Sequence, residues 1–364
     1  MAGREEPSSL SHQGTLPLET VRLRLRRFRL TDGKEMYENW AKDPEVARWM
    51  TWRAHANVKI TRDCLNAWCS HYRPDFYKWG IVWKETGALI GSIDLMHFNE
   101  EAKSADLAYA LSRSYWKRGI VPEASRRVLR FAFEEIGLER INGQFDGDNL
   151  ASGRVMQKLG MQFHQVIPDG YTNNQGILLP VTEYTLTRED FSRCRIIQAN
   201  RGEEAETAAL YEAVIDGLEQ IGNPPGWKKG AYPAMDTAVE ALEKGNLFSV
   251  WKEGRLIGSF ILDEEQPEGY TQAVWKFPAR KPLVLHTLAL HPNEQRKGLS
   301  KQILDFIAQF AREHGCDVIR LDVAAGNLPA IRCYTSAGFQ CAGKIDLGLG
   351  EIGLPEFLAY EKQV

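Results

Sequence analysis

Two matching stretches decide the fold of this chain: GDNLASGRVMQKLGMQ at residues 147–162 and AGNLPAIRCYTSAGFQ at residues 325–340. They share an Asn-Leu pair, an Arg, a Gly and a final Gln. Each shared residue lies 178 positions after its counterpart, as Asn149 and Asn327 illustrate (327 − 149 = 178). Self-similarity at a fixed offset is the signature of a repeated structural unit.

Each stretch is preceded by a basic turn with a glycine and then by an amphipathic segment. The two segments read KRGIVPEASRRVLRFAFEEIG at residues 117–137 and RKGLSKQILDFIAQFAREHG at residues 296–315. Gly119 lies 30 residues before Asn149 (149 − 119), and Gly298 lies 29 residues before Asn327 (327 − 298). Two motifs that recur at nearly equal spacing predict two related domains.

The residue pattern of each copy predicts a helix, a strand and a second helix. In the second copy the first helix should end at Gly315, where a left-handed cap is favoured, and VIRLDVAA should form a strand. Asn327 is the expected N-cap of the next helix, with Pro329 in its first turn. In the first copy we expect a helix over about 122–136, a strand near 141–145 and a helix after Asn149. Each half is therefore expected to be α+β.

Length and composition are consistent with two globular domains. A chain of 364 residues exceeds the usual size of one hydrophobic core, and 43% hydrophobic with 26% charged residues is ordinary for a folded protein. We expect a flexible tail over residues 1–15 and domains over 16–190 and 191–364. No apolar run reaches the roughly 20 residues of a membrane span, so a soluble, cytoplasmic protein is expected.

Charge and cysteine usage exclude several classes of function. The formal net charge of −3 offers no global attraction for nucleic acid or an anionic membrane. The arginines at residues 22–29 alternate with apolar residues, which favours an outward-facing charged strand surface over a binding patch. The six cysteines lack CxxC or His-rich spacing, so reduced thiols and no metal site are expected.

The run HPNEQRKGLS at residues 291–300 lies between the expected strand LVLHTLAL and a helix. Successive backbone N–H groups at such a helix start can form a concave anion site, which suits a pyrophosphate. The run contains neither a Walker pattern nor GxGxxG. By itself the turn does not distinguish an anion site from an ordinary turn.

Together with the downstream spacing, these residues resemble the GNAT superfamily of N-acetyltransferases, whose acetyl-CoA signature is Q/R-x-x-G-x-G/A. Ser300 replaces the usual small residue at its end, and NLPAIRCYTSAGF resembles the family's N-x-x-A-x-x-x-Y-x-x-x-G-F. The resemblance implies two tandem acyl-CoA N-acyltransferase folds, each a mixed, mostly antiparallel twisted sheet flanked by helices. It places Tyr334 beside the thioester sulfur. The residues it assigns to acetyl-CoA in the second half are Leu288, Leu290, Gln295, Arg296, Lys297, Gly298, Leu299, Ser300 and Asn327.

The first half resembles another branch, that of the ribosomal-protein N-terminal acetyltransferases, in ADLAYALSRSYWKRGIVPEA at residues 105–124. Ser152 matches that branch's N-x-x-S and is expected to face the thioester. Met156 stands where Tyr334 stands in the second copy, so no equivalent phenolic acid is expected. Val121 stands where Gly or Ala is usual and is expected to crowd the phosphate approach. The residues assigned to the cofactor here are Lys117, Arg118, Gly119, Ile120, Val121 and Asn149.

Acetyl transfer to an amine needs a base, an oxyanion donor and a proton source for the thiolate. An alkyl amine with a pKa near ~10 is only about one part in a thousand neutral at pH 7. His286 is the candidate base of the second half and Tyr334 its candidate acid, with a backbone N–H at the splayed strand ends for the oxyanion. The alternative is a structural His286 that packs with Leu288 and Leu290 on one strand face. Asp106 is the candidate base of the first half.

The predicted activity is transfer of an acetyl group from acetyl-CoA to a primary amine by direct attack, with the second domain better equipped. The alternative is a first domain that only binds acyl-CoA weakly or serves as a scaffold. The acceptor is expected to be a small molecule or a peptide N-terminus, and aminoglycosides, polyamines, amino acids and protein N-termini all remain open. Nucleic acid and membrane partners are not expected, and the sequence does not indicate the oligomeric state.

Overall fold

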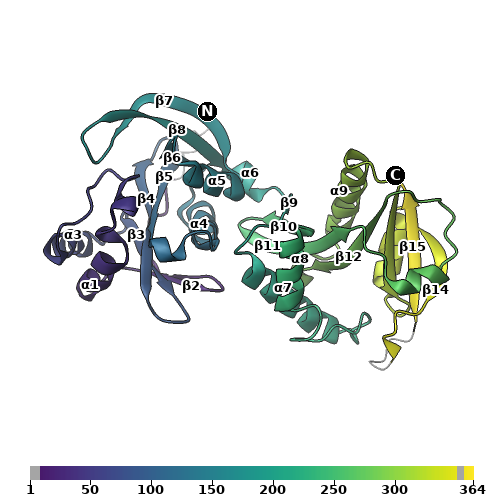
Figure 1. Cartoon of the computed structure of the whole chain (residues 1–364). Coiled ribbons are helices and arrows are strands. Elements are labelled where there is room, and N and C mark those ends of the chain that lie inside the picture. Colours follow the sequence, from purple (N-terminus) through teal and green to yellow (C-terminus); the bar gives the residue numbers. More distant parts are fainter. Residues whose placement is uncertain (1–8, 351–355) are drawn as a thin grey trace, which may run out of the picture. The chain divides into compact units, whose positions relative to one another are not determined.

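The computed structural model describes residues 9–350 and 356–364. The chain divides into two compact units, residues 1–193 (domain 1) and residues 194–364 (domain 2). Each unit has its own sheet and its own helices (Figure 1). Among the described residues there is no helix with the length and apolarity that a membrane crossing requires.

Domain 1 is built on an eight-stranded sheet in the order β1-β2-β3-β4-β5-β6-β8-β7. Neighbouring strands are antiparallel except for the pair β5–β6, which is parallel. The strands span β1 Leu18–Glu19, β2 Leu23–Arg26, β3 Tyr77–Trp83, β4 Leu89–Asn99, β5 Ser104–Leu111, β6 Arg140–Asp146, β7 Gln162–Thr172 and β8 Leu178–Thr187.

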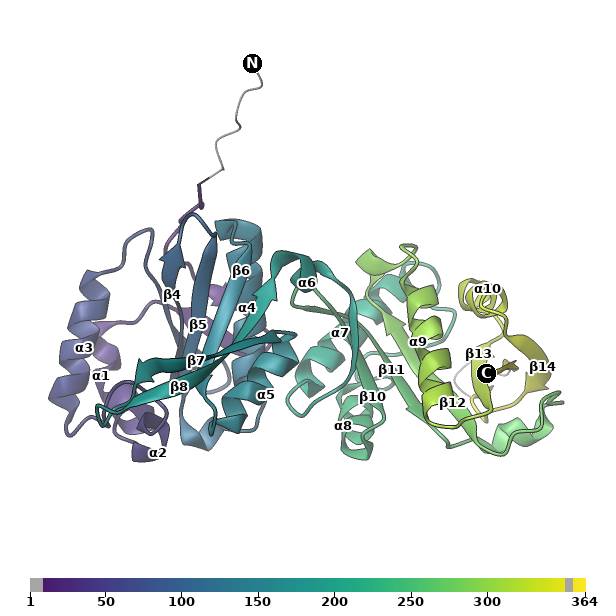
Figure 2. The same cartoon turned by 90° about the horizontal axis from the view of Figure 1, so that it is seen from above.

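Helices cover both faces of this sheet (Figures 1 and 2). α4 and α5 pack on one face over the largest apolar core of the domain, and α1 to α3 cover a second core on the other face. The helices span α1 Gly33–Met36, α2 Pro44–Ala47, α3 Val58–Ser70, α4 Ile120–Phe131, α5 Leu150–Leu159 and α6 Arg188–Ser192. A wider helical turn over residues 132–136 continues α4.

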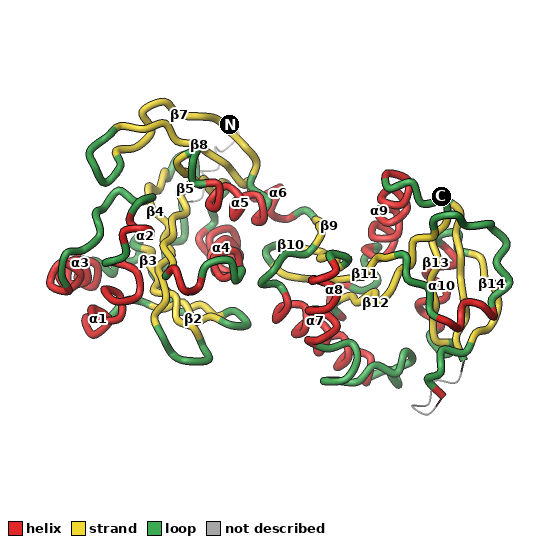
Figure 3. The backbone as a smooth tube through the Cα atoms, in the orientation of Figure 1, coloured by secondary structure: helices red, strands yellow, loops and turns green. Residues whose placement is uncertain are grey.

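Domain 2 repeats this architecture with a seven-stranded sheet in the order β14-β15-β13-β12-β11-β10-β9. Its parallel pair is β12–β13. α9 and α10 pack over one core, and α7 and α8 pack over smaller clusters. The elements span β9 Arg195–Gln198, α7 Glu204–Glu219, α8 Met235–Lys244, β10 Leu247–Lys252, β11 Arg255–Asp263, β12 Pro282–Leu290, α9 Leu299–Glu313, β13 Val318–Ala324, α10 Leu328–Ser336, β14 Gln340–Ile345 and β15 Phe357–Gln363. Figure 3 shows these strands in yellow and the helices in red.

The predicted α+β class and the mixed, mostly antiparallel sheets are confirmed. Asn327 is the N-cap of α10, since its side chain accepts from the Ala330 N–H, and Pro329 lies in the first turn. Asn149 caps α5 in the same way by accepting from the Ser152 N–H.

Residues 9–15 differ from the expected flexible tail, of which residues 1–8 lie outside the described residues. Leu10 and Thr15 are buried, and the Thr15 hydroxyl donates to the Phe76 carbonyl at 2.7 Å. The Ser11 N–H donates to the Ile136 carbonyl at 2.8 Å. An apolar side chain and paired backbone groups fix this segment on domain 1.

The arginine-rich strand is occupied by ion pairs rather than free for a ligand. Arg22 donates to the buried Glu123 at 2.6 Å, and Arg26 donates to Asp32 at 2.7 Å. The Glu123 carboxylate also accepts from the Arg22 N–H at 2.9 Å. These arginines are mostly buried in their pairs, so the prediction of an outward-facing surface holds poorly for them, while Arg24 stays exposed.

Candidate functional site

The loops before α4 and α9 have the same backbone conformation. Arg296 (φ 62°) and Gly298 (φ 80°) are left-handed in domain 2, and Lys117 (φ 62°) and Gly119 (φ 70°) match them in domain 1. Alternating right- and left-handed residues turn successive N–H groups inward and form an anion-binding concavity, here at the N-terminus of a helix. A Cβ at Gly298 would meet nothing within 4 Å, so the concavity is open at that point. Both loops therefore fit a phosphate group.

One side chain fastens each loop to the strand before it. The Gln295 amide donates to the Leu290 carbonyl at 3.2 Å, and the Trp116 indole N–H donates to the Leu111 carbonyl at 2.8 Å. Trp116 and Gln295 hold the same place three residues before the glycine. Gln295, which was predicted to contact the cofactor, thus has a role in loop shape as well.

The other predicted loop residues divide by exposure. Ile120 and Leu299 are buried, so they can offer only their backbone N–H groups. Val121 was expected to crowd the phosphate approach, but its side chain lies in the apolar core with 8% exposed, because the helix turns that position inward. The basic side chains are exposed and free to face an anion; they are Lys117, Arg118, Arg296 and Lys297.

The parallel strands of each domain separate beside the loop. In domain 2 the pairing of β12 with β13 ends at Leu285 and Leu321, although β12 continues to Leu290. In domain 1 the pairing of β5 with β6 ends at Asp106 and Asn142. We call the gap between the two strands the split. The split lies next to the loop, so a molecule bound to both could place its reactive end between the strands.

A β-bulge in β12 reorients the residues around the domain 2 split. Thr287 has φ 49°, and the register with β11 shifts here. A bulge leaves its extra residue unpaired, which provides a backbone N–H for an oxyanion. Leu288 and Leu290 were expected to share the face of His286, but the bulge turns them toward the core beneath α9. His286 instead shares the face of Val284, so the predicted packing of the imidazole with these leucines is wrong.

His286 is held by Asp263, which follows it across the strand pair β11–β12. His286 Nε2 lies 3.0 Å from Asp263 Oδ1. Burial alone would lower the pKa of His286, but the hydrogen bond and charge of Asp263 raise it above its ordinary value overall. Burial conversely raises the pKa of Asp263, and His286 outweighs this and lowers it. When the imidazole is neutral, its Nε2–H donates to Asp263 and leaves Nδ1 as the proton acceptor.

Asp322 on β13 is a site residue that the sequence reasoning did not single out. Tyr270 donates to its Oδ1 at 2.9 Å, and burial raises the pKa of Asp322. The signal in the sequence was an aspartate inside the apolar strand VIRLDVAA. The second such residue is Tyr232, whose hydroxyl lies 2.7 Å from that of Thr287 at the bulge.

Tyr334 lies on α10 with 8% of its surface exposed and packs edge-on against Phe339. Burial raises its pKa, and the charges of Cys333 and Asp322 add to the effect. The phenol therefore keeps its proton throughout the physiological pH range. The influence of Asp322 on Tyr334 and on His286 indicates that the three groups share one region.

In domain 1 the strand register places Asp106 differently from its prediction. Asp106 pairs with Asn142, as Val284 pairs with Arg320 in domain 2. Ala108, two residues further on, thus holds the position of His286, because the bulge adds one residue to β12 only. Asp106 is engaged by its neighbours: Asn142 Nδ2 donates to it at 3.1 Å, and His97 Nδ1 lies 2.9 Å away.

Ser152 lies at the start of α5, where its hydroxyl accepts from Asn149 Nδ2 at 3.1 Å. Tyr109 of β5 brings a buried hydroxyl beside it. Burial raises the pKa of Tyr109 to about 12, and Ser152 opposes the shift. Met156 is buried at the place of Tyr334, so the phenol in this region of domain 1 comes from a strand instead of a helix.

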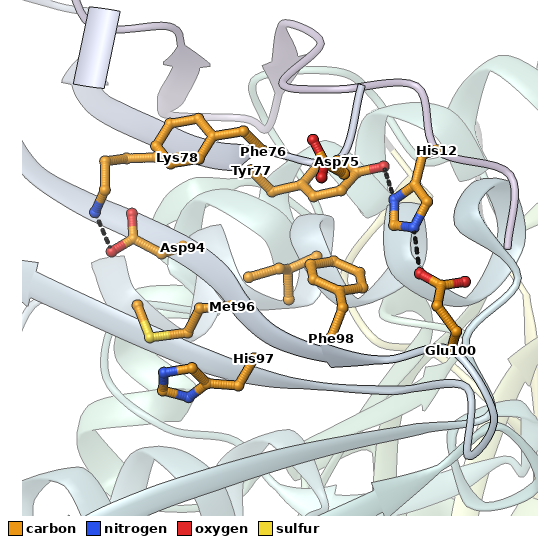
Figure 4. A pocket seen from close by; sticks show the side chains of 11 residues that line it. His12, Asp75, Phe76, Tyr77, Lys78, Asp94, Met96, His97, Phe98 and Glu100 are labelled. Carbon is orange, nitrogen blue, oxygen red and sulfur yellow. Dashed lines mark hydrogen bonds and ion pairs between the residues drawn. The ribbon is translucent and has the colours of Figure 1, made fainter. Parts of the chain in front are cut away.

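Domain 1 also contains a cavity of about 420 Å³ at the start of β3 and the end of β4 (Figure 4). His12 joins Tyr77 Oη at 3.0 Å to Glu100 Oε1 at 2.8 Å on one side of it. On the other side Lys78 donates to Asp94 at 2.5 Å. His97 also lines the cavity, so Asp106 lies between this cavity and β6.

Comparisons with known proteins agree with this geometry. A family model described as acetyltransferase (GNAT) domain matches residues 22–162, and one described as acetyltransferase (GNAT) family matches residues 212–339. N-acetyltransferase p20 of Bacillus licheniformis is 26% identical over 176 residues, which is 48% of this chain and 98% of that protein. A GNAT-family acetyltransferase structure from Bacillus anthracis is 20% identical, covers 48% of this chain and 99% of its own, and has a TM-score of 0.43.

The chain therefore belongs to the GNAT acetyltransferases and carries two of their domains in tandem. It is an acyltransferase of the acetyltransferase class. GNAT acetyltransferases use acetyl-CoA as cosubstrate, and the two anion-binding loops fit its phosphates.

Proposed function

We propose that domain 2 transfers the acetyl group of acetyl-CoA to a primary amine by direct attack. The observation that carries this proposal is the combination of the His286–Asp263 pair, 3.0 Å apart, with the split between β12 and β13 and the anion-binding loop that follows β12. A base, an oxyanion donor and a cofactor cradle thus belong to one strand and its ends.

The loop residues 296–300 would hold the pyrophosphate through their backbone N–H groups, with the exposed Arg296 and Lys297 adding positive charge. Asn327 would contact the pantetheine arm. Its Oδ1 caps α10, which leaves Nδ2 as a donor to that arm. Leu288 and Leu290 line the cofactor through their backbone, because their side chains face the core.

His286 would take the proton that the attacking amine loses. Its Nδ1 lone pair is available in the neutral form, and Asp263 stabilises the imidazolium that results. The unpaired backbone N–H of the bulge at Thr287 would donate to the oxyanion that forms as the amine attacks.

Tyr334 would donate to the departing sulfur. Its raised pKa keeps the hydroxyl protonated, so it is a hydrogen-bond donor at every relevant pH. Direct attack is favoured over a covalent enzyme intermediate, because burial raises the pKa of the neighbouring Cys333 and keeps it a thiol, an effect that Ser300 only partly opposes.

For domain 1 we propose a weaker acetyltransferase site or an acyl-CoA-binding module. Its loop matches that of domain 2, but Ala108 stands at the position of His286. Asp106 is its candidate base, Ser152 its candidate thioester contact, and the cavity beside Asp106 offers room for an acceptor.

The test is acetyl transfer by the intact chain to a panel of primary amines, with release of the coenzyme A thiol as the readout. The proposal predicts turnover that His286→Ala removes almost entirely. Turnover that His286→Ala leaves unchanged would assign the activity to domain 1 or to another base.

A further inference from the structure

Asp322 and His286 face each other across the split of domain 2. Val284 and Arg320 are paired across β12 and β13, and the pairing ends one residue later. His286 and Asp322 are each two residues beyond that pair, so they lie on the same face at the point where the strands separate. The charge of Asp322 contributes to the raised pKa of His286.

The Asp322 carboxylate is held in place from one side. Tyr270, 2% exposed, donates to Oδ1 at 2.9 Å, and the Trp275 indole N–H donates to the Tyr270 carbonyl at 3.1 Å. Arg320 stacks on Trp275 at 4.0 Å and donates to Gln266, so it is engaged elsewhere. In the part of the chain that the structure describes, Asp322 has no basic ion-pair partner, and its Oδ2 makes no hydrogen bond.

We infer that Asp322 anchors the ammonium group of the acceptor, and that domain 2 selects amines without a neighbouring carboxylate. This inference rests on the proposed function of domain 2. A primary amine reaches the site as a cation, because only about one molecule in a thousand is neutral at pH 7. The carboxylates of Asp322 and Asp263 face one imidazole, so the site is net negative when His286 is neutral and ready to act as base.

The same charges determine what the site excludes. An acceptor that carries its own carboxylate brings a second negative charge toward Asp322 and Asp263, and like charges at short range disfavour binding. The acceptor class is therefore a monoamine or polyamine of cationic character. An amino acid does not belong to this class.

Domain 1 serves as an internal comparison for this assignment. Two residues beyond its Asp106–Asn142 pair lie Ala108 and Gln144, where domain 2 has His286 and Asp322. Gln144 donates to Glu183 at 2.8 Å and is neutral. The anionic anchor is thus a property of domain 2 and not of the shared fold.

The experiment compares three probes of equal chain length in the intact protein: n-butylamine, putrescine and 4-aminobutyrate. Wild-type protein should acetylate the first two with a KM at least about 10-fold below that of 4-aminobutyrate. Asp322→Asn, which keeps the size of the side chain, should raise the KM of butylamine and putrescine about 10- to 100-fold and leave 4-aminobutyrate nearly unchanged. Affinity for acetyl-CoA should stay the same.

Two further variants keep this test decisive. Asp305→Asn makes the same chemical change on the exposed side of α9 and should alter no KM. Tyr270→Phe removes only the hydrogen bond that aims the carboxylate and should raise the butylamine KM by less than Asp322→Asn does.

The inference is overturned if wild-type protein accepts 4-aminobutyrate as readily as butylamine, or if Asp322→Asn keeps the parental KM values in a folded protein. The proposed function fails separately, and this inference with it, if the chain binds acetyl-CoA and acetylates none of the three amines.

Discussion

The two domains share one cofactor loop and differ at the split beside it. Left-handed residues stand at Lys117 and Gly119 in domain 1 and at Arg296 and Gly298 in domain 2, whereas the bulge at Thr287 has no counterpart at that point of β5. The loop needs only backbone groups, so different side chains can build it. Proton transfer needs particular side chains at particular positions. The comparison teaches that binding of acetyl-CoA and turnover can be separated within one chain.

The largest effect is expected from Gly298→Glu, which places bulk and negative charge in the phosphate concavity. We expect acetyl-CoA binding by domain 2 to be lost, measured by calorimetry on the intact chain. Gly315→Glu is the matched control, because Gly315 is also left-handed (φ 70°), has nothing within 4 Å of a Cβ and lies just beyond the C-terminal end of α9. Both variants carry the same backbone strain of about 1–2 kcal/mol. Equal loss of binding in both would remove the loop from the site.

His286→Ala should lower the turnover of domain 2 by roughly 10²- to 10⁴-fold, because a positioned base contributes an effect of that order. The acidic limb of the pH profile should flatten, and acetyl-CoA affinity should barely change. Steady-state rates against pH give both results. A variant with the parental rate and profile would make the histidine structural.

Tyr334→Phe should lower turnover by a smaller factor, about 10-fold, because the coenzyme A thiolate is already a fair leaving group. Packing against Phe339 should be preserved, since only the hydroxyl is removed. The measurement is kcat alongside the melting temperature. A parental kcat at an unchanged melting temperature would leave Tyr334 as a core aromatic residue.

The smallest effect is a shift in pH dependence on Asp263→Asn. Asp263 raises the pKa of His286, so wild-type kcat/KM should rise with pH through a midpoint above the ordinary value of 6.5, as the imidazole loses its proton. The variant removes the carboxylate, lowers that pKa and should move the acidic limb to lower pH. A midpoint that stays in place would separate Asp263 from the base.

Local patterns predicted the shared parts of the fold well. The spacing from Gly298 to Asn327, the N-cap at Asn327 and the strand VIRLDVAA all depend on near neighbours in the sequence, and the structure has each of them. The same holds for α5 and its cap at Asn149.

The parts that differ between the domains depend on register and long-range contacts. A threonine does not mark a left-handed bulge, so Thr287 gave no signal, and the one-residue offset that moves Asp106 away from the place of His286 went with it. Asp322 finds its partner Tyr270 at a distance of 52 residues in the sequence, which no local pattern reveals.

The most direct test of the central claim compares acetyl transfer by two loop variants of the intact chain, Gly119→Glu and Gly298→Glu. Both glycines cap their helices in the same left-handed conformation, so each change removes one cofactor site by the same means. We predict that Gly119→Glu keeps most of the amine acetylation and that Gly298→Glu loses it. Activity that survives Gly298→Glu and disappears with Gly119→Glu would contradict the assignment of turnover to domain 2.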